Sequence, residues 1–348
     1  MTIVLNPVAR SGQAALSRRM RRIASVRFTW ARKLGYNGIA ELLQIFAREH
    51  VGRIKNEART TMIKLGLMFV NSGPFAEPGL LAHLAKTAEE RGFESLWTVE
   101  HVVIPHDYKT PYPYARSGKI PGGEDVAIPD PLLPLAYAAA VTSRIRLATG
   151  ILILPQRHPL YVAKEVATLD VLSRGRVILG IGSGWLKEEF DALGLDFHQR
   201  GARTDEAVAA MRALWREDTA SFHGKHFDFH DLKSFPKPVQ SGGVPIHVGG
   251  HSPAAARRAG RMGDGFFPAL GEADQLKPLF EIMREAAREA GRDPGAIELS
   301  CAGRASVETI KPLLDIGISR VVIAPPAFDA DGLTRGLDKI ANDVLATL

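Results

Sequence analysis

A glutamate and a histidine, Glu100 and His101, stand side by side at the end of an apolar run and have clear chemical potential. An imidazole exchanges a proton near neutral pH, and a carboxylate beside it can support that exchange. His101 is therefore a candidate general acid or base, with Glu100 as its support. A histidine that only makes structural hydrogen bonds would give the same pattern, so the residue types alone favour neither interpretation.

Two glycine-containing segments also follow apolar runs and come directly before helical patterns. They are Gly182-Ser183-Gly184 and Gly249-Gly250-His251-Ser252. Glycine lets backbone N–H groups approach an anion, and the start of a helix favours negative charge, so both segments are candidate contacts to a phosphorylated ligand. Ordinary turns that need glycine for a positive φ would explain them equally well.

Several familiar motifs are excluded by single residues. Trp185 occupies the position of the third glycine of a dinucleotide fingerprint. A nucleophile elbow needs glycine two residues before and two residues after its serine, but Ser183 has Ile181 and Trp185 at those positions. His223, His226 and His230 could suggest a metal site, but on a β-hairpin we expect these offsets to point the side chains in different directions. We therefore expect no metal.

The single cysteine, Cys301, lies in an apolar run and is expected to be a buried structural thiol. One cysteine cannot form an internal disulfide, which fits a reducing compartment and predicts a cytoplasmic location. No stretch of the sequence approaches the length of apolar residues that a membrane span requires, so no membrane partner is expected.

Short β-branched runs alternate with helical patterns from Met62 onward, and this alternation is typical of βα units with a parallel sheet. Strands are expected at 63–70, 95–99, 145–151, 177–181, 245–248, 265–267, 297–301 and 320–323. Helices are expected at 77–91, from about 131, and at 160–172, 203–215, 252–262, 273–290, 306–316 and 331–346. Eight such units predict a (β/α)8 TIM barrel with insertions.

The insertions are a long loop, 105–129, rich in proline, tyrosine and glycine, and a β-hairpin about Gly224 within 219–229. In a barrel of this type the carboxyl ends of the strands meet at one face and carry the site. The fold therefore brings Glu100, His101 and the two glycine-containing segments together.

Positive charge is concentrated in residues 1–61, which hold 12 of the 44 lysines and arginines and only three of the 38 acids. The remaining 32 bases and 35 acids give residues 62–348 a slightly negative balance, so no nucleic-acid partner is expected. Residues 1–61 are interpreted as a basic extension, poorly ordered or partly helical at 39–54. They could also be upstream sequence translated from a misassigned start, with Met62 the true one.

An ordered set of motifs runs through residues 62–345. It includes Trp97-Thr-Val-Glu-His-Val-Val-Ile-Pro105, Asp130-Pro-Leu-Leu-Pro134, Thr142 to Pro159, Ala167 to Arg176, Gly182-Ser-Gly-Trp185, Glu188-Glu-Phe190, Arg200-Gly-Ala-Arg203 and Pro245-Ile-His-Val-Gly-Gly250. With these motifs the sequence resembles the luciferase-like monooxygenase superfamily, and within it the branch that uses the deazaflavin coenzyme F-420. Each motif is weak alone, but their order and spacing are specific.

The resemblance implies a role for several positions. It implies a non-prolyl cis peptide at Gly150-Ile151, next to Thr149, which backs the central ring of a deazaflavin or flavin. The two glycine-containing segments correspond to the family's ribityl and phosphate contacts. Glu100-His101 corresponds to an acid–histidine pair near the ring, with glutamate where aspartate is common. Four side chains of the long loop would cover the substrate: Tyr108, Tyr112, Tyr114 and Arg116.

The implied activity is hydride transfer between reduced coenzyme F-420 and a small organic substrate, with a separate enzyme reducing the cofactor. One alternative is a two-component monooxygenase that uses FMN and molecular oxygen. A third hypothesis, from another class, is a non-catalytic barrel that only binds a cofactor or ligand. A homodimer is expected, because luciferase-like barrels commonly pair.

Overall fold

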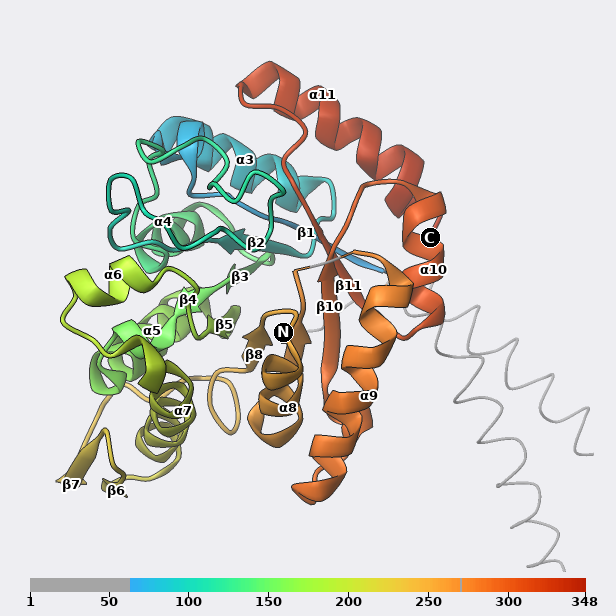
Figure 1. The fold of residues 1–348 in the computed structure, drawn as a ribbon. Coiled ribbons are helices and arrows are strands. Elements are labelled where there is room, and N and C mark those ends of the chain that lie inside the picture. Colours follow the sequence, from blue (N-terminus) through green and yellow to red (C-terminus); the bar gives the residue numbers. More distant parts are fainter. Residues whose placement is uncertain (1–62, 270) are drawn as a thin grey trace, which may run out of the picture. The chain divides into compact units, whose positions relative to one another are not determined.

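The computed structural model describes residues 63–269 and 271–348. Our expectations for the extension, residues 1–61, lie outside the described residues. Element labels follow Figure 1, in which the strands lie at the centre and the helices surround them. Among the described residues no helix has both the length and the apolar character needed to cross a membrane.

The strands of the main sheet close into a parallel barrel, as the sequence predicts. They are β1 (Lys64–Leu67), β2 (Ser95–Thr98), β3 (Arg146–Thr149), β4 (Leu152–Ile153), β5 (Val177–Gly182), β8 (Ile246–Gly249), β9 (Gly265–Phe267), β10 (Glu298–Ala302) and β11 (Arg320–Ile323). The short β4 continues β3 after a break at Gly150 and Ile151, so the barrel has eight strand positions. A direct β3–β5 pairing completes the ring.

The helices outside the barrel agree with the expected ranges to within a few residues. They are α3 (Pro78–Glu90), α4 (Leu132–Val141), α5 (Pro159–Ser173), α6 (Lys187–Ala192), α7 (Arg200–Arg216), α8 (Pro253–Met262), α9 (Ala273–Glu289), α10 (Val307–Asp315) and α11 (Ala330–Ile340). The six-residue α6 was not expected as a separate helix. It follows β5 directly and becomes important for the site.

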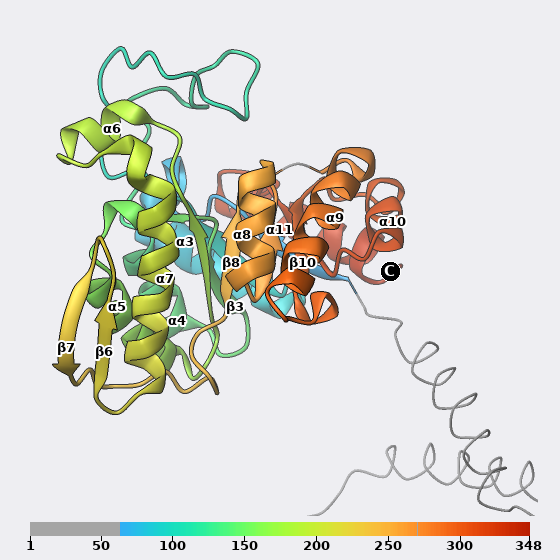
Figure 2. The ribbon, with the colours of Figure 1, turned by 60° about the horizontal axis from the view of Figure 1, so that its bottom comes forward.

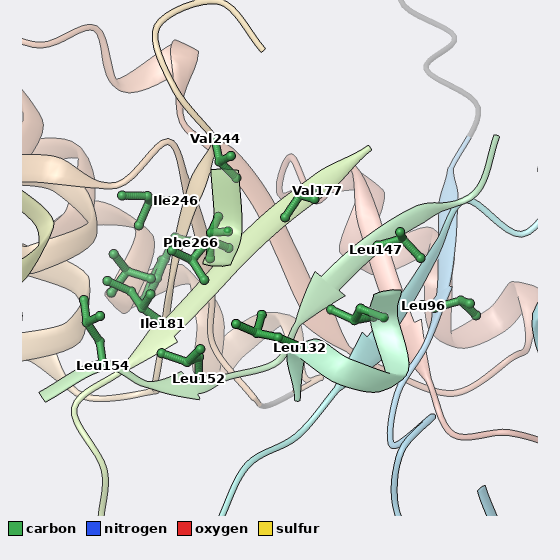
Figure 3. Packing of buried hydrophobic residues seen from close by; sticks show 14 of the residues in the cluster. Leu96, Leu132, Leu147, Leu152, Leu154, Val177, Ile181, Val244, Ile246 and Phe266 are labelled. Atoms are coloured by element: carbon green, nitrogen blue, oxygen red, sulfur yellow. The ribbon is translucent and has the colours of Figure 1, made fainter. Parts of the chain in front are cut away.

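Successive residues of each strand face opposite sides, and this alternation divides the core in two. Residues such as Leu96, Leu147 and Ile181 face outward and pack under the helices (Figure 3). The inward-facing residues fill the barrel around the fully buried ring of Trp97. Cys301 belongs to the outward set, is buried as expected, and burial raises the pKa of its thiol to about 12.

The amino-terminal end of the barrel, which we call the floor, is filled by charged side chains in ion pairs. The guanidinium of Arg320 is fully buried and donates to Glu94 at 2.8 Å and to Glu298 at 2.8 Å. Glu298 also pairs with Lys64. These ion pairs satisfy the charges that burial would otherwise penalise.

Both predicted insertions are present. The hairpin consists of β6 (Ala220–His223) and β7 (Asp228–Leu232), which pair antiparallel beside α7. The loop 105–129 contains no helix or strand and extends above α6 at the top of Figure 2. Both lie outside the barrel wall, and the loop is on the side where the strands end.

Candidate active site

His101 follows β2 and is held by a carboxylate that the sequence analysis did not identify. Its Nδ1 lies 3.0 Å from Oε2 of Glu189 on α6, and the His101 side chain is only 10% exposed. The other carboxylate oxygen of Glu189 accepts hydrogen bonds from the backbone N–H groups of Val102 at 2.7 Å and Val103 at 3.3 Å. An ionised carboxylate only accepts, so Nδ1 of His101 carries the hydrogen and Nε2 is left to exchange a proton.

Glu100 does not support His101, which corrects our expectation. Its carboxylate accepts a hydrogen bond from the backbone N–H of Ile153 and from Nε of Arg157 at 2.8 Å. Arg157 also donates to Asp130 at 2.6 Å. Burial raises the pKa of Glu100, and the charge of Arg157 opposes that shift. Both residues lie in the loop after β2, where the Glu100 carboxylate turns to β4 and Arg157 while His101 turns to Glu189 on α6.

The peptide bond between Gly150 and Ile151 is cis, as the resemblance implies. The side chain of Ile151 lies against the backbones of two other strand ends. A methyl group on Gly182 would lie 2.6 Å from Cδ1 of Ile151, and one on Gly249 would lie 2.5 Å from Cγ2. These two glycines are therefore explained by close packing around Ile151. They are thus no evidence for a phosphorylated ligand, and such evidence must come from the loop residues that follow them.

Two loop glycines adopt backbone conformations that side chains rarely tolerate, Gly184 with φ of 80° and Gly250 with φ of 109°. Among the described residues, no hydrogen-bond acceptor contacts the backbone N–H groups of Gly184, Trp185, His251 or Ser252. The strands that lead to these groups, β5 and β8, are neighbours in the barrel. The loops thus offer free donors at adjacent strand ends, which is the arrangement that an anion needs.

The other residues expected to contact a cofactor differ in which of their polar groups remain available to a ligand. Thr149 is buried and its hydroxyl donates to the Gly180 carbonyl at 2.6 Å, so only its backbone could contact a ligand. Ser252 caps α8 by accepting from the Ala255 N–H, and Ser183 lies 3.3 Å from the Thr204 hydroxyl. The fourth residue, His251, is described next.

His251 carries a buried Nδ1 with no partner among the described residues. Burial lowers the pKa of this imidazole, which favours the neutral ring. A buried polar atom without a partner costs free energy and often marks a ligand contact. Its ring packs edge-on against Tyr114, with 4.9 Å between the ring centroids.

The long loop joins His101 to His251 through a chain of aromatic rings. Trp185 contacts His101, Tyr108 and Tyr112, with ring centroids 5.6, 5.7 and 5.2 Å apart. Tyr112 in turn contacts Tyr114 at 5.3 Å. Burial raises the pKa of Tyr112 to about 12, so its phenol stays neutral. We call these rings, from His101 through Trp185 to His251, the aromatic arc.

The loop is also fastened to α6 by backbone hydrogen bonds. Glu188 accepts from the N–H groups of Lys109 at 2.7 Å and Thr110 at 3.0 Å. Tyr108 is buried, and its hydroxyl accepts from the N–H of Ile120. Arg116 is exposed and makes no hydrogen bond or ion pair with the described residues. Of the four predicted loop residues, the three tyrosines join the aromatic arc and Arg116 does not.

Comparison with known proteins decides the family. The model of the luciferase-like monooxygenase family matches residues 59–309. This chain belongs to that family. An uncharacterised protein of Mycobacterium tuberculosis is 32% identical over 272 residues, which cover 76% of this luciferase-like chain and 93% of the relative. An F-420-dependent glucose-6-phosphate dehydrogenase of Kineococcus radiotolerans is 35% identical over 227 residues, covering 64% of this chain and 62% of that one.

Solved structures share the fold of this luciferase-like protein. The monooxygenase RslO1 from Streptomyces bottropensis has a TM-score of 0.65 and 26% identity, over 82% of this chain and 99% of that chain. An F-420-dependent secondary alcohol dehydrogenase, solved with an F-420–acetone adduct, has a TM-score of 0.68 and 21% identity, with the same coverage.

Two residues of this luciferase-like site, Glu189 and Trp185, were missed as site residues by the sequence analysis. Both lie in motifs that carried the resemblance, but nothing in their spacing indicated a contact with His101, 84 to 88 residues earlier. Because β2 and β5 both end at the mouth of the barrel, the short α6 can bring them together. The contact between the buried carboxylate of Glu189 and His101 can be recognised only in the folded structure.

Proposed function

We propose that this protein transfers hydride between coenzyme F-420 and a small organic substrate. The observation that carries the proposal is His101 at the barrel mouth, oriented by Glu189 so that Nε2 remains available for proton transfer. The choice of cofactor is supported by the relatives that are named F-420-dependent dehydrogenases, at 35% and 31% identity.

The described residues fit a phosphorylated ring cofactor. The free N–H groups of Gly184, Trp185, His251 and Ser252 could receive its phosphate, and the unpartnered Nδ1 of His251 adds a polar contact. Gly150 and Ile151 would back its ring, as the family resemblance implies. Gly184 itself is required by its positive φ and by close packing, because a methyl group there would lie 2.7 Å from the ring of Phe190.

A bound deazaflavin would supply the hydride and would react slowly with oxygen, since carbon replaces the reactive flavin nitrogen. The protein would then have two tasks. His101 would give a proton to, or take one from, the substrate atom whose charge changes during hydride transfer. The aromatic arc, with Tyr108, Tyr112 and Tyr114 on the loop, would cover the substrate and exclude water.

Titration of the purified full chain with F-420 and with FMN, followed by the fluorescence of each cofactor, tests the proposal. We expect stoichiometric binding of F-420, and we expect substitution of His101 by Asn to preserve binding while abolishing turnover. Tight binding of FMN without affinity for F-420 would instead favour an FMN-dependent monooxygenase, which the 26% identity to a monooxygenase supports. Stoichiometric F-420 binding without turnover of any substrate in a broad panel would favour a non-catalytic barrel.

A further inference from the structure

Two imidazoles and a carboxylate lie together on the outer face of the β6–β7 hairpin, which has no part in the function proposed above. Nδ1 of His223 lies 3.1 Å from Oδ1 of Asp228, and Nε2 of His230 lies 3.3 Å from the same oxygen. The ring centroids of the two histidines are 4.4 Å apart. One ligand atom from each of the three side chains lies within 4.8 Å of the others.

Strand pairing explains why these side chains converge although the sequence analysis expected them to diverge. In an antiparallel hairpin, two residues that pair across the strands point to the same face. Here an odd-numbered residue of β6 pairs with an even-numbered residue of β7, so counting alternate residues through the turn assigns the wrong face. His223 pairs with Asp228, and His230 is two residues beyond Asp228 on the same face of β7. The opposite face carries Phe222 and Phe229, which turn toward the protein. The expectation of diverging side chains was wrong for His223 and His230.

We infer that His223, Asp228 and His230 form a binding site for a divalent transition cation of the zinc class. Imidazole nitrogen and carboxylate oxygen together suit Zn²⁺, Ni²⁺ or Cu²⁺ rather than Mg²⁺, which prefers oxygen alone. Tetrahedral ligands about 2.0–2.2 Å from zinc lie roughly 3.3–3.5 Å from one another. The two distances from a histidine nitrogen to Oδ1 of Asp228, 3.1 and 3.3 Å, already approach that value. The side chains are about 60% exposed, so small rotations can complete the geometry.

Three protein ligands leave at least one coordination position open to water or to a group from another molecule. This distinguishes the site from a closed structural zinc centre. Glu206 on α7 already accepts the backbone N–H groups of Lys225, His226 and Phe227 at the turn. A bound cation would therefore link the outer sides of two strands that are already positioned.

A second cluster, His106, Asp107 and Glu124 in the long loop, is the internal competitor. It contains one imidazole and two carboxylates, and Glu124 already accepts from His106 Nδ1 at 2.8 Å and from the Asp107 N–H at 3.0 Å. Zinc-class cations gain more from a second imidazole than from a second carboxylate. We therefore expect the hairpin cluster to bind first.

Isothermal titration of ZnCl₂ into the EDTA-stripped full chain, prepared without a histidine tag, tests the inference. We expect one tight Zn²⁺ per chain, weakened about tenfold or more in H223A/H230A and also weakened in D228N. His226→Ala removes a histidine from the same hairpin but not from the cluster, and His106→Ala disables the competitor. Both controls should bind Zn²⁺ like the unmodified chain, and MgCl₂ should produce no comparable binding.

Hydrogen exchange supplies a second, local measurement. Zn²⁺ should slow amide exchange within 220–232 in the unmodified chain and leave exchange in H223A/H230A unchanged. Unchanged Zn²⁺ affinity in the double variant would overturn the inference, as would loss of tight binding in H106A alone. Circular dichroism of each variant confirms the fold, which substitutions at such exposed positions should preserve.

Discussion

At the floor of the barrel the fully buried guanidinium of Arg320 is bonded to Glu94, Glu298 and Ser300, whereas at the mouth the buried Nδ1 of His251 has no partner among the described residues. Charged groups at the floor are closed into ion pairs. Among the described residues each end leaves one buried imidazole nitrogen without a partner, Nδ1 of His247 at the floor and Nδ1 of His251 at the mouth, and the mouth also leaves several backbone N–H groups open. The difference separates the end of the barrel that stabilises the fold from the end that can bind and react.

Glycines follow this division only in part. Gly66 and Gly265 are closed in by the side chains of Trp97 and His247, so they make room for the barrel's own filling. Gly182 and Gly249 at the mouth make room for Ile151 in the same way. The mouth differs in having Gly184 and Gly250, which have positive φ and stand next to backbone N–H groups that contact no acceptor among the described residues.

The largest effect should come from the mouth. Substituting His101 by Asn is expected to lower kcat with F-420 and an accepted substrate by roughly 10²–10⁴-fold, because the proton donor or acceptor is lost. The midpoint of urea unfolding and the F-420 affinity should change little. Steady-state kinetics beside a denaturation curve measures both. A large loss of stability with retained kcat would show that His101 stabilises the fold and does not take part in the reaction.

The next effect should come from the floor. Arg320→Met removes the buried cation that pairs with the partly buried carboxylates of Glu94 and Glu298, although Glu298 keeps its ion pair with Lys64, and we expect a loss of about 3–5 kcal/mol in the free energy of unfolding. Urea denaturation near neutral pH measures it. The matched control is Arg91→Met, which breaks more exposed ion pairs with Glu90 and Asp338 and should cost below about 1 kcal/mol. Equal losses in the two variants would contradict the distinction between floor and surface.

The packing at the mouth offers a smaller and more specific effect. Gly182→Ala places a methyl group 2.6 Å from Cδ1 of Ile151, and overpacking of this kind costs about 1–3 kcal/mol. Ile151→Ala removes both Cδ1 and Cγ1, which the added methyl group would meet at 2.6 and 2.8 Å, so Gly182→Ala should cost at most half as much in the Ile151→Ala background. The coupling energy comes from four unfolding measurements. Purely additive effects would contradict the explanation of Gly182 by packing against Ile151.

Much of the fold was predictable because a buried parallel barrel imposes a strong pattern. Strands at 265–267 and 320–323 were predicted with the observed bounds, since turn residues flank short apolar runs there. The strand expected at 145–151 is observed as β3 over Arg146–Thr149 only, and β4 resumes the barrel position at Leu152–Ile153, beyond the expected end. Hydrophobicity continues through Gly150 and Ile151, so the run alone could not reveal the break. The resemblance, rather than the hydrophobic pattern, located it.

The site was only partly predictable, because its hydrogen bonds join distant parts of the sequence. His101 was identified as a candidate, but its partner Glu189 lies 88 residues away, and the adjacent Glu100 was wrongly expected to fill that role. Adjacency in sequence misled here because the two side chains leave the loop after β2 in different directions, Glu100 toward Arg157 and His101 toward Glu189. The hairpin histidines misled because the cross-strand pairing of His223 with Asp228 places both histidines on one face, which spacing along the sequence does not show.

The smallest effect near neutral pH concerns the acid dependence of the floor. Glu298 has its pKa lowered to about 2, against burial, mainly by the charge of Arg320, and burial lowers the pKa of His247 to about 4. A lowered pKa means that the unfolded chain binds protons more readily than the folded chain, so stability falls as pH falls. His247 contributes between about pH 6.5 and 4, and Glu298 between about pH 4.5 and 2.

The free energy of unfolding should therefore change little between about pH 8 and 7 and decline progressively below about pH 6.5. Urea denaturation across this range measures the decline. In His247→Gln the upper part of the decline, above about pH 4.5, should flatten, while the lower part, which Glu298 contributes, should remain. Substituting His251 at the mouth removes a half-buried imidazole whose ring is not enclosed by charges, and its effect on the same profile should be smaller. If the His251 variant flattened the profile more than the His247 variant, the floor would not be the main source of acid sensitivity.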